Sequence, residues 1–191
     1  MNAAEKAALR RRIREHTPDP EALRAESAAL CARILESALF REAKAVAAFV
    51  PLPGEADIRP VLAACLASGK RLALPATRAD LSMTFRLAMD LAALTPDAFG
   101  IPAPGPEAPE IPAGDLDLML VPLSAVDARG YRLGKGGGCY DRWLRAHAFR
   151  GVTLGVALRH QWVERVPAEA WDIPLERAVT PDTLVIFPEN P

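Results

Sequence analysis

Helical and extended hydrophobic patterns alternate along the first part of the chain. Residues 3–15 predict a short, strongly basic helix. A second helix is predicted from Asp19, a natural N-cap followed by Pro20, to about Phe40, because apolar residues recur there at helical spacing. The apolar run 45–50 then predicts a buried strand that ends at two prolines.

The same alternation continues to the end of the chain. Asp57 and Pro60 predict the start of a helix that Gly69 ends, and residues 71–74 predict a strand that Pro75 stops. The remaining predicted elements are strands at 83–88, 116–123, 151–158 and 183–187 and a helix from about Tyr140 to Ala148.

Strands that alternate with helices predict an α/β fold. We expect a three-layer, Rossmann-like sandwich with a largely parallel central sheet, preceded by the basic N-terminal helix. Segment 95–115 is too rich in proline and glycine for regular structure, so a long functional loop is predicted there. Ligands bind beyond the carboxyl ends of parallel strands, which singles out two loops, 51–57 and 122–140.

Composition narrows the class of protein. Half of the 191 residues are hydrophobic, a quarter are charged and the net charge is -1, as in soluble globular proteins. A nucleic-acid partner would favour a basic excess, and a membrane span would need roughly 20 consecutive apolar residues. The N-terminus lacks the apolar core of a secretory signal. We therefore expect one domain, residues 1–191, forming a cytoplasmic monomer without nucleic-acid or membrane partners.

Cysteine and histidine are too scattered to predict a metal centre. Cys31, Cys65 and Cys139 form no C-x-x-C pair, which argues against a zinc site or a disulfide framework. Cys31 and Cys65 fall in apolar helical patterns and are predicted to be core thiols. Cys139 differs because it follows a run of glycines.

That run belongs to the segment RLGKGGGCYDRW, residues 132–143, which carries the strongest candidate chemistry. Glycines allow backbone N–H groups to form a concave anion site, and the following helix start adds partial positive charge. Arg132 and Lys135 add full charges, so the segment suits a polyphosphate. Asp141 fits this setting if a magnesium ion joins it to the phosphates.

The spacing matches neither common nucleotide-binding motif. A P-loop requires a Ser or Thr directly after its lysine, and none follows Lys135. A dinucleotide fingerprint requires a third glycine three residues after its second, and Cys139 occupies that position after Gly134 and Gly136. A flexible surface turn with solvated charges is the alternative. The position between a predicted strand and a predicted helix favours phosphate binding.

The longer segment VPLSAVDARGYRLGKGGGCYDRWL resembles the signature of the 5-formyltetrahydrofolate cyclo-ligase family. The resemblance also includes the basic N-terminal helix, VPLPGEAD, FGIPAP and GVALRHQWVERVPAEAWDIPL. It implies ATP- and magnesium-dependent cyclisation of 5-formyltetrahydrofolate to 5,10-methenyltetrahydrofolate, with release of ADP and phosphate. A phosphorylated formyl group, an iminium phosphate, would be the intermediate. Such a reaction needs positioning and charge neutralisation more than a protein nucleophile.

The resemblance also implies roles for individual residues, with ATP and Mg²⁺ as the implied cofactors and a reduced folate as the substrate. The implied ATP-binding residues are Lys6, Arg10, Arg132, Leu133, Gly134, Lys135, Gly136, Gly137, Gly138, Cys139 and Tyr140. Arg132 and Lys135 are the implied catalytic residues, with Lys135 near the transferred phosphoryl group. The implied folate-binding residues are Val50, Glu55 and Phe99, and the implied magnesium ligands are Asp141 and Asp172.

Without the resemblance, five of these residues have an ordinary structural explanation. Lys6 and Arg10 could form a solvated basic face, and Asp172 a turn or cap. Glu55 could be an ordinary loop carboxylate, and Phe99 could anchor the proline-rich loop in the core.

Two positions depart from the family pattern: Cys139 replaces the first tyrosine of Tyr-Tyr-Asp, and Val126 replaces a phenylalanine. Two other functions stay open. One is a folate- or nucleotide-binding protein without catalysis, and the other is a sugar-phosphate isomerase, for which no general base is evident in the sequence.

Overall fold

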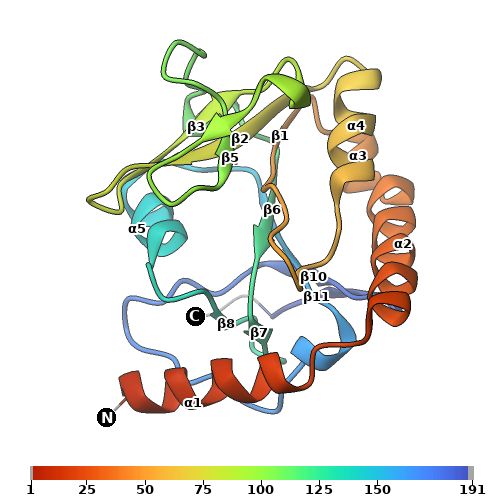
Figure 1. Ribbon diagram of the computed structural model, residues 1–191, viewed down its shortest axis with the longest axis vertical. Helices are drawn as coiled ribbons and strands as arrows, with labels where there is room; N and C mark the ends of the chain where they lie inside the picture. Colours follow the sequence, from red (N-terminus) through yellow and green to blue (C-terminus); the bar gives the residue numbers. More distant parts are fainter. Residues whose placement is uncertain (1, 189–191) are drawn as a thin grey trace.

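The computed structural model describes residues 2–188 and has a seven-stranded sheet between helices (Figure 1). The helices are α1 (Asn2–Glu15), α2 (Pro20–Glu36), α3 (Ala38–Glu42), α4 (Arg59–Ala67) and α5 (Cys139–Ala146). In spatial order the strands are β11 (Leu184–Ile186), β10 (Arg177–Val179), β9 (Val152–Val156), β6 (Leu118–Pro122), β1 (Ala45–Ala47), β2 (Arg71–Thr77) and β3 (Met83–Leu87). Within the described residues, no helix combines the length and apolarity needed to cross a membrane.

The strand order places a topological switch point at the centre of the sheet. Strands β10, β9, β6, β1 and β2 are parallel, and the two edge strands, β11 and β3, are antiparallel to their neighbours. Val46 of β1 pairs with Leu72 of β2 on one side and Leu118 of β6 on the other. The chain thus builds outward from β1 in both directions, and the loops that follow β1 and β6 meet at one edge. This confirms the predicted α/β fold with a largely parallel sheet.

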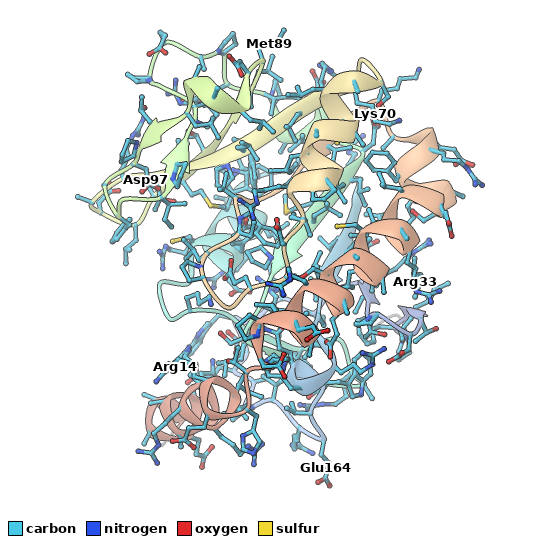
Figure 2. All side chains as sticks on the ribbon, turned by 45° about the vertical axis from the view of Figure 1, so that its right-hand side comes forward. Arg14, Arg33, Lys70, Met89, Asp97 and Glu164 are labelled. Carbon is cyan, nitrogen blue, oxygen red and sulfur yellow. The ribbon has the colours of Figure 1, made fainter. Side chains whose placement is uncertain are left out.

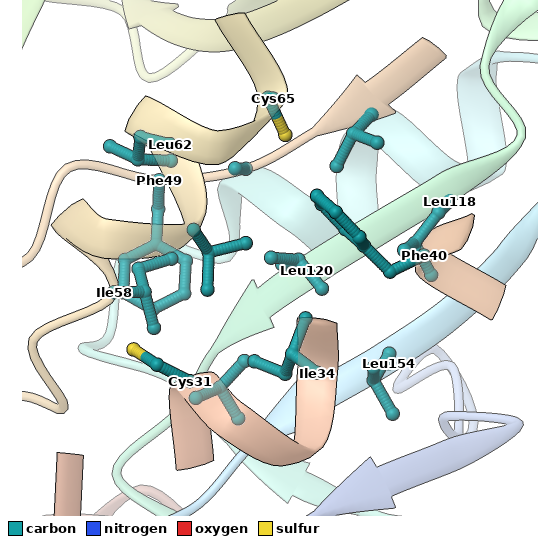
Figure 3. Packing of buried hydrophobic residues seen from close by; sticks show 14 of the residues in the cluster. Cys31, Ile34, Phe40, Phe49, Ile58, Leu62, Cys65, Leu118, Leu120 and Leu154 are labelled. Atoms are coloured by element: carbon teal, nitrogen blue, oxygen red, sulfur yellow. The ribbon is translucent and has the colours of Figure 1, made fainter. Parts of the chain in front are cut away.

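Alternating residues of the central strands build two separate cores. Val46 and Leu120 face α2 and α4, where Ile34 and Leu62 are also buried (Figure 3). Their neighbours Ala47 and Met119, by contrast, pack on the opposite face with Trp143 of α5. Figure 1 shows the same division, with α2, α3 and α4 on one side of the sheet and α5 on the other. The predicted three-layer arrangement follows from this alternation.

The two predicted core thiols are confirmed. Cys31 and Cys65 lie in the cluster of Figure 3, with exposed fractions of 4% and 0%. Burial raises the pKa of each thiol to about 11. Both groups therefore stay protonated near neutral pH and act as small apolar side chains.

Pro75 shortens β1 rather than ending β2, contrary to the sequence prediction. The carbonyl of Ala73 accepts from the N–H of Ala48, so alternate residues of β2 turn their polar backbone groups toward β1. Pro75 faces the same side and has no N–H to donate. The ladder to β1 stops there, which makes β1 shorter than the strand predicted for 45–50. Pairing with β3 carries β2 on to Thr77.

A second correction concerns the helix predicted to continue to Phe40. Helix α2 begins as predicted, with the Asp19 carboxylate accepting from the N–H groups of Glu21 and Ala22. It ends at Glu36 because Ser37 is extended, and the Ser37 hydroxyl accepts from the N–H of Phe40 to begin α3.

The proline-rich segment 95–115 contains more structure than its composition predicts. Strands β4 (Thr95–Pro96) and β5 (Pro102–Ala103) form a short hairpin, and residues 113–115 form one 3₁₀ turn. Asp97, labelled in Figure 2, accepts from the N–H groups of Phe99, Ile101 and Thr77. One carboxylate therefore closes the hairpin and ties it to the end of β2, which composition alone does not reveal.

Candidate active site

Two cavities share the loop that follows β6: the loop after β1 lines the first of them, and helix α1 lines the second. The hairpin β7 (Ala125–Val126) and β8 (Arg132–Leu133) leads into the glycine loop, residues 134–138, and then into α5. Leu133 is buried with Leu9 and Ile13 of α1, so the N-terminal helix packs against the base of this loop. Both cavities are lined by Arg132, Gly134, Gly137, Gly138 and Asp141.

The first of the two cavities has a volume of about 170 Å³ and is called the apolar cavity below. Its further lining residues are Phe49, Val50, Leu52, Glu55, Pro75, Thr77, Met83, Ile101, Pro122, Lys135, Cys139 and Tyr140. Val50 and Glu55, two of the three residues predicted to bind folate, thus line the same cavity, and their role stays a prediction. Phe99 does not line this cavity and is 51% exposed. Its exposure excludes a core anchor, and its role in folate binding stays a prediction.

Glu55 is one of two carboxylates that line the apolar cavity, and Asp141 is the other. The Glu55 side chain is 7% exposed, one carboxylate oxygen accepts from the N–H of Leu52 at 2.9 Å, and the other lies 2.9 Å from Lys135 Nζ. The Tyr140 hydroxyl is buried without a hydrogen-bond partner among residues 2–188. Burial, followed by the charge of Glu55, raises the pKa of Tyr140, so the phenol remains a donor.

The second, called the polar cavity, has a volume of about 420 Å³. Its further lining residues are Ala3, Lys6 and Arg10 of α1, Leu133 and Gly136, Arg142 and Arg145 of α5, and Glu169, Trp171 and Asp172. With Arg132, five of the side chains that line the polar cavity are cationic, and three, Asp141, Glu169 and Asp172, are anionic. The lining therefore carries a net positive charge, which favours an anionic ligand.

Helix α1 is held to the polar cavity by its two predicted ATP-binding residues. Lys6 Nζ lies 2.7 Å from Asp172 Oδ2 and 3.0 Å from Glu169 Oε2. Burial alone would lower the pKa of Lys6, but hydrogen bonds to Asp172 and Glu169 outweigh it and raise the pKa overall. Arg10 Nε donates to the carbonyl of Gly134 at 2.7 Å, which fixes the start of the glycine loop.

The glycine loop presents its backbone N–H groups to the cavities. Gly136 and Gly138 have φ values of +117° and +65°, a region that favours glycine. Gly138 is also the N-cap of α5. Across residues 2–188, no protein acceptor is recorded for the N–H groups from Lys135 to Tyr140. Unpaired N–H groups at a helix start are suited to bind an anion, and the anion site of this loop stays a prediction.

Arg132 is fixed by a buried ion pair. Its exposed fraction is 8%, Nη2 lies 2.9 Å from Asp141 Oδ1, and Nη1 donates to the carbonyl of Ile173 at 2.6 Å. The N–H of Ile173 donates in turn to the same Asp141 oxygen. Hydrogen bonds to both ends of the guanidinium hold it in one orientation at the junction of the two cavities.

The two predicted magnesium ligands, Asp141 and Asp172, both line the polar cavity. In each, one oxygen accepts from protein donors, whereas the other has no partner recorded among residues 2–188. No group of three or more His, Cys, Asp or Glu side chains that could hold a metal occurs in the described part of the chain. Two carboxylates fit a magnesium ion that takes its other ligands from phosphates and water.

Sequence reasoning missed five residues of the polar cavity: Ala3, Arg142, Arg145, Glu169 and Trp171. Arg142 and Arg145 follow Asp141 in α5, so a helical projection from the glycine loop could have suggested them. Glu169 and Trp171 precede Asp172 in the segment EAWD, but nothing in their pattern separates them from ordinary turn residues.

Comparison with known proteins agrees with this architecture. The sequence model of the 5-formyltetrahydrofolate cyclo-ligase family matches residues 2–181. The 5-formyltetrahydrofolate cyclo-ligase of Escherichia coli K12 is 33% identical over 177 residues, covering 91% of this chain and 96% of that protein. The enzyme of the same name from Mycolicibacterium smegmatis is 34% identical over 170 residues, covering 85% and 86%.

A solved structure extends the likeness to three dimensions. The NMR structure of Aquifex aeolicus 5,10-methenyltetrahydrofolate synthetase matches with a TM-score of 0.84 and 32% identity, covering 97% of this chain and 94% of that one. A synthetase from Mycoplasma pneumoniae, at 19% identity and a TM-score of 0.75, shares the fold. With a family match across nearly the whole chain, this protein belongs to the 5-formyltetrahydrofolate cyclo-ligase family.

Proposed function

We propose that this protein is a cytoplasmic, monomeric enzyme that cyclises 5-formyltetrahydrofolate to 5,10-methenyltetrahydrofolate, using ATP and releasing ADP and phosphate. Besides family membership, one observation supports the proposal: the apolar cavity and the polar cavity share residues of the glycine loop and Arg132. A folate in the first and a triphosphate in the second would meet at that loop. The reaction requires this meeting, because a phosphoryl group must pass from one substrate to the other.

The apolar cavity suits the pterin ring and formyl group of the folate. Glu55 can accept hydrogen bonds from ring N–H and amino groups, since its carboxylate is already desolvated and held by Leu52. The buried Tyr140 hydroxyl can donate to a substrate oxygen. Val50 and the other apolar side chains exclude water from the reacting group.

The polar cavity suits the triphosphate. N–H groups of the glycine loop would bind phosphate oxygens, and Lys6 and Arg10 would add positive charge from α1. Lys135 is 56% exposed and lines the apolar cavity beside Glu55, so it can turn toward the phosphoryl group that leaves the nucleotide. The fixed guanidinium of Arg132 stabilises negative charge without reorganising during the reaction.

The chemistry then follows in two displacements. The formyl oxygen attacks the terminal phosphorus, ADP leaves, and the formyl carbon becomes an iminium phosphate. The neighbouring folate nitrogen attacks that carbon, phosphate departs with the former formyl oxygen, and the nitrogen loses its proton to the departing phosphate. Arg132 and Lys135 neutralise charge in both steps.

Asp141 and Asp172 would hold the magnesium ion, each through its uncommitted carboxylate oxygen. When bound, magnesium supplies additional neutralisation of phosphate charge. The protein's own contribution is to orient these carboxylates: Arg132 and the N–H of Ile173 hold Asp141, and Lys6 holds Asp172.

An absorbance assay tests the proposal. Purified protein with 5-formyltetrahydrofolate, magnesium and ATP is expected to generate the near-ultraviolet absorbance of the methenyl product. A protein that is folded by circular dichroism yet forms no product at any ATP concentration would refute it. Tight binding of the folate without ATP consumption would favour a non-catalytic binding protein instead.

A further inference from the structure

Trp171 exposes a large aromatic surface at the polar cavity. The residue is 53% exposed and lies in the turn 169–172, between Glu169 and Asp172. Among residues 2–188, no stacked aromatic ring or cation is recorded for its indole, whereas Trp143 and Trp162 both stack on neighbouring rings. An indole left open to solvent beside a binding cavity is a surface on which a planar ligand can stack.

The turn that carries Trp171 is rigidly attached to the cavity. The N–H of Glu169 donates to Asp172 Oδ2 at 2.9 Å, and the N–H of Asp172 donates to the carbonyl of Glu169 at 2.9 Å. Both carboxylates also bind Lys6 of α1. Trp171 therefore sits between two anchored residues, so a ligand that stacks on it need not order the backbone first.

Among the described residues that line the polar cavity, Trp171 alone has an aromatic ring. Apart from Trp171, the lining residues within the described chain are charged, glycine, or the aliphatic Ala3 and Leu133. The glycine loop and the cations account for phosphate groups, but they offer no apolar plane. A nucleotide whose phosphates lie on the loop can place its base against Trp171, in the same cavity.

We infer that Trp171 forms the base subsite of the nucleotide, with its indole stacked on the purine of ATP. This inference rests on the proposed assignment of the polar cavity to ATP. Because stacking reads the π-face of a base rather than its hydrogen-bonding edge, the subsite tolerates other purine nucleotides and favours purines, which have the larger ring. Loss of one such stack is expected to weaken ATP binding about 10-fold.

Fluorescence titration tests the stack without requiring turnover. ATP is expected to quench the emission of the wild-type protein, whereas inorganic triphosphate, which has no base, leaves it unchanged. Trp171→Phe abolishes the quench by ATP. Trp162→Phe is the matched control and retains it, because Trp162 stacks on Phe187 and does not line the polar cavity. A quench that persists in Trp171→Phe would overturn the inference.

Kinetics provide the second measurement. Trp171→Ala is expected to raise the KM for ATP about 10-fold, with the KM for folate and the kcat at saturating ATP unchanged. Trp171→Phe, which keeps an aromatic ring, is expected to recover most of the affinity. An ATP KM in Trp171→Ala within about twofold of wild type would contradict the inference, since a stack is worth more than that.

The two proposals fail separately. If no methenyl product forms but ATP still quenches Trp171, the proposed function is refuted and the base subsite stands. If product forms normally and neither measurement responds to Trp171, only the subsite is refuted.

Discussion

Replacing Asp141 by asparagine tests the buried pair that links stability to catalysis. Asp141 Oδ1 lies 2.9 Å from Arg132 Nη2, and the two side chains are 22% and 3% exposed. The amide is nearly isosteric with the carboxylate and can still accept from Arg132 and from the N–H of Ile173. The variant therefore removes one negative charge while keeping the local shape.

The structure sets the expected size of the stability change. Removing one partner of a fully buried ion pair costs about 3–5 kcal/mol, because the other charge stays buried and unpaired. The hydrogen bonds that the introduced amide retains offset part of this cost, since a hydrogen bond to a charged group contributes about 1.5–3 kcal/mol. We expect a net loss of about 2 kcal/mol, or a fall in Tm of about 4–8 °C for a chain of this size. The variant remains folded at 25 °C.

Turnover is expected to fall much further than stability. Asp141→Asn removes the negative charge of a proposed magnesium ligand, which is also the charge paired with Arg132, so kcat should drop about 100-fold or more. The methenyl absorbance at 25 °C measures turnover, and a circular dichroism melt measures Tm. Asp115→Asn is the matched control, because the exposed pair of Asp115 with Arg71 at 3.4 Å contributes at most about 1 kcal/mol. Wild-type turnover in Asp141→Asn would refute the proposed role, and an unchanged Tm would refute the buried-pair argument.

Three further predictions address other parts of the molecule. Glu55→Gln is expected to raise the KM for 5-formyltetrahydrofolate at least about 10-fold and to leave the KM for ATP unchanged, because Glu55 lines the apolar cavity and not the polar cavity. Equal effects on the two KM values would contradict this prediction. Leu120→Ala, at a fully buried position, should lower the free energy of unfolding by about 2–5 kcal/mol in urea titrations while kcat at 25 °C is preserved; a loss below about 1 kcal/mol would refute the packing argument. Burial lowers the pKa of His160 below its usual 6.5, so the unfolded chain takes up a proton first and stability declines as pH falls below 6.5. His160→Gln should remove that part of the decline, and an identical pH profile in the variant would count against it.

Most of the fold could be predicted from the sequence because helix caps, turns and apolar runs determine the backbone conformation of the few residues around them. The Asp19 cap, the Gly138 turn and the apolar runs of β6 and β9 each dictate backbone geometry nearby. Strand β10, Arg177–Val179, was missed because it lies between Glu176 and Thr180, without the longer apolar runs that predicted the equally short β1 and β11. Pro75 was misjudged because its effect depends on which neighbouring strand its nitrogen faces, and this is fixed only when the sheet assembles.

The candidate site shows a different limit. Sequence reasoning assigned its cations to ATP and its carboxylates to magnesium or folate, as separate groups. In the structure they pair with one another: Lys6 with Asp172, Arg132 with Asp141 and Lys135 with Glu55. Lys6 and Asp172 are 166 positions apart, so no local pattern encodes their contact. The pairing orients these charges before a ligand arrives, and a bound phosphate or folate must take over part of each pair.

Transfer of the formyl oxygen to phosphate is the measurement that tests the proposed activity most directly. The protein would be supplied with ATP, magnesium and 5-formyltetrahydrofolate carrying ¹⁸O in its formyl group, and the released phosphate would be examined by mass spectrometry. The account predicts one ¹⁸O atom in each phosphate, formed in step with one ADP and one methenyl product. Unlabelled phosphate, or ADP formed without methenyl product, would contradict it.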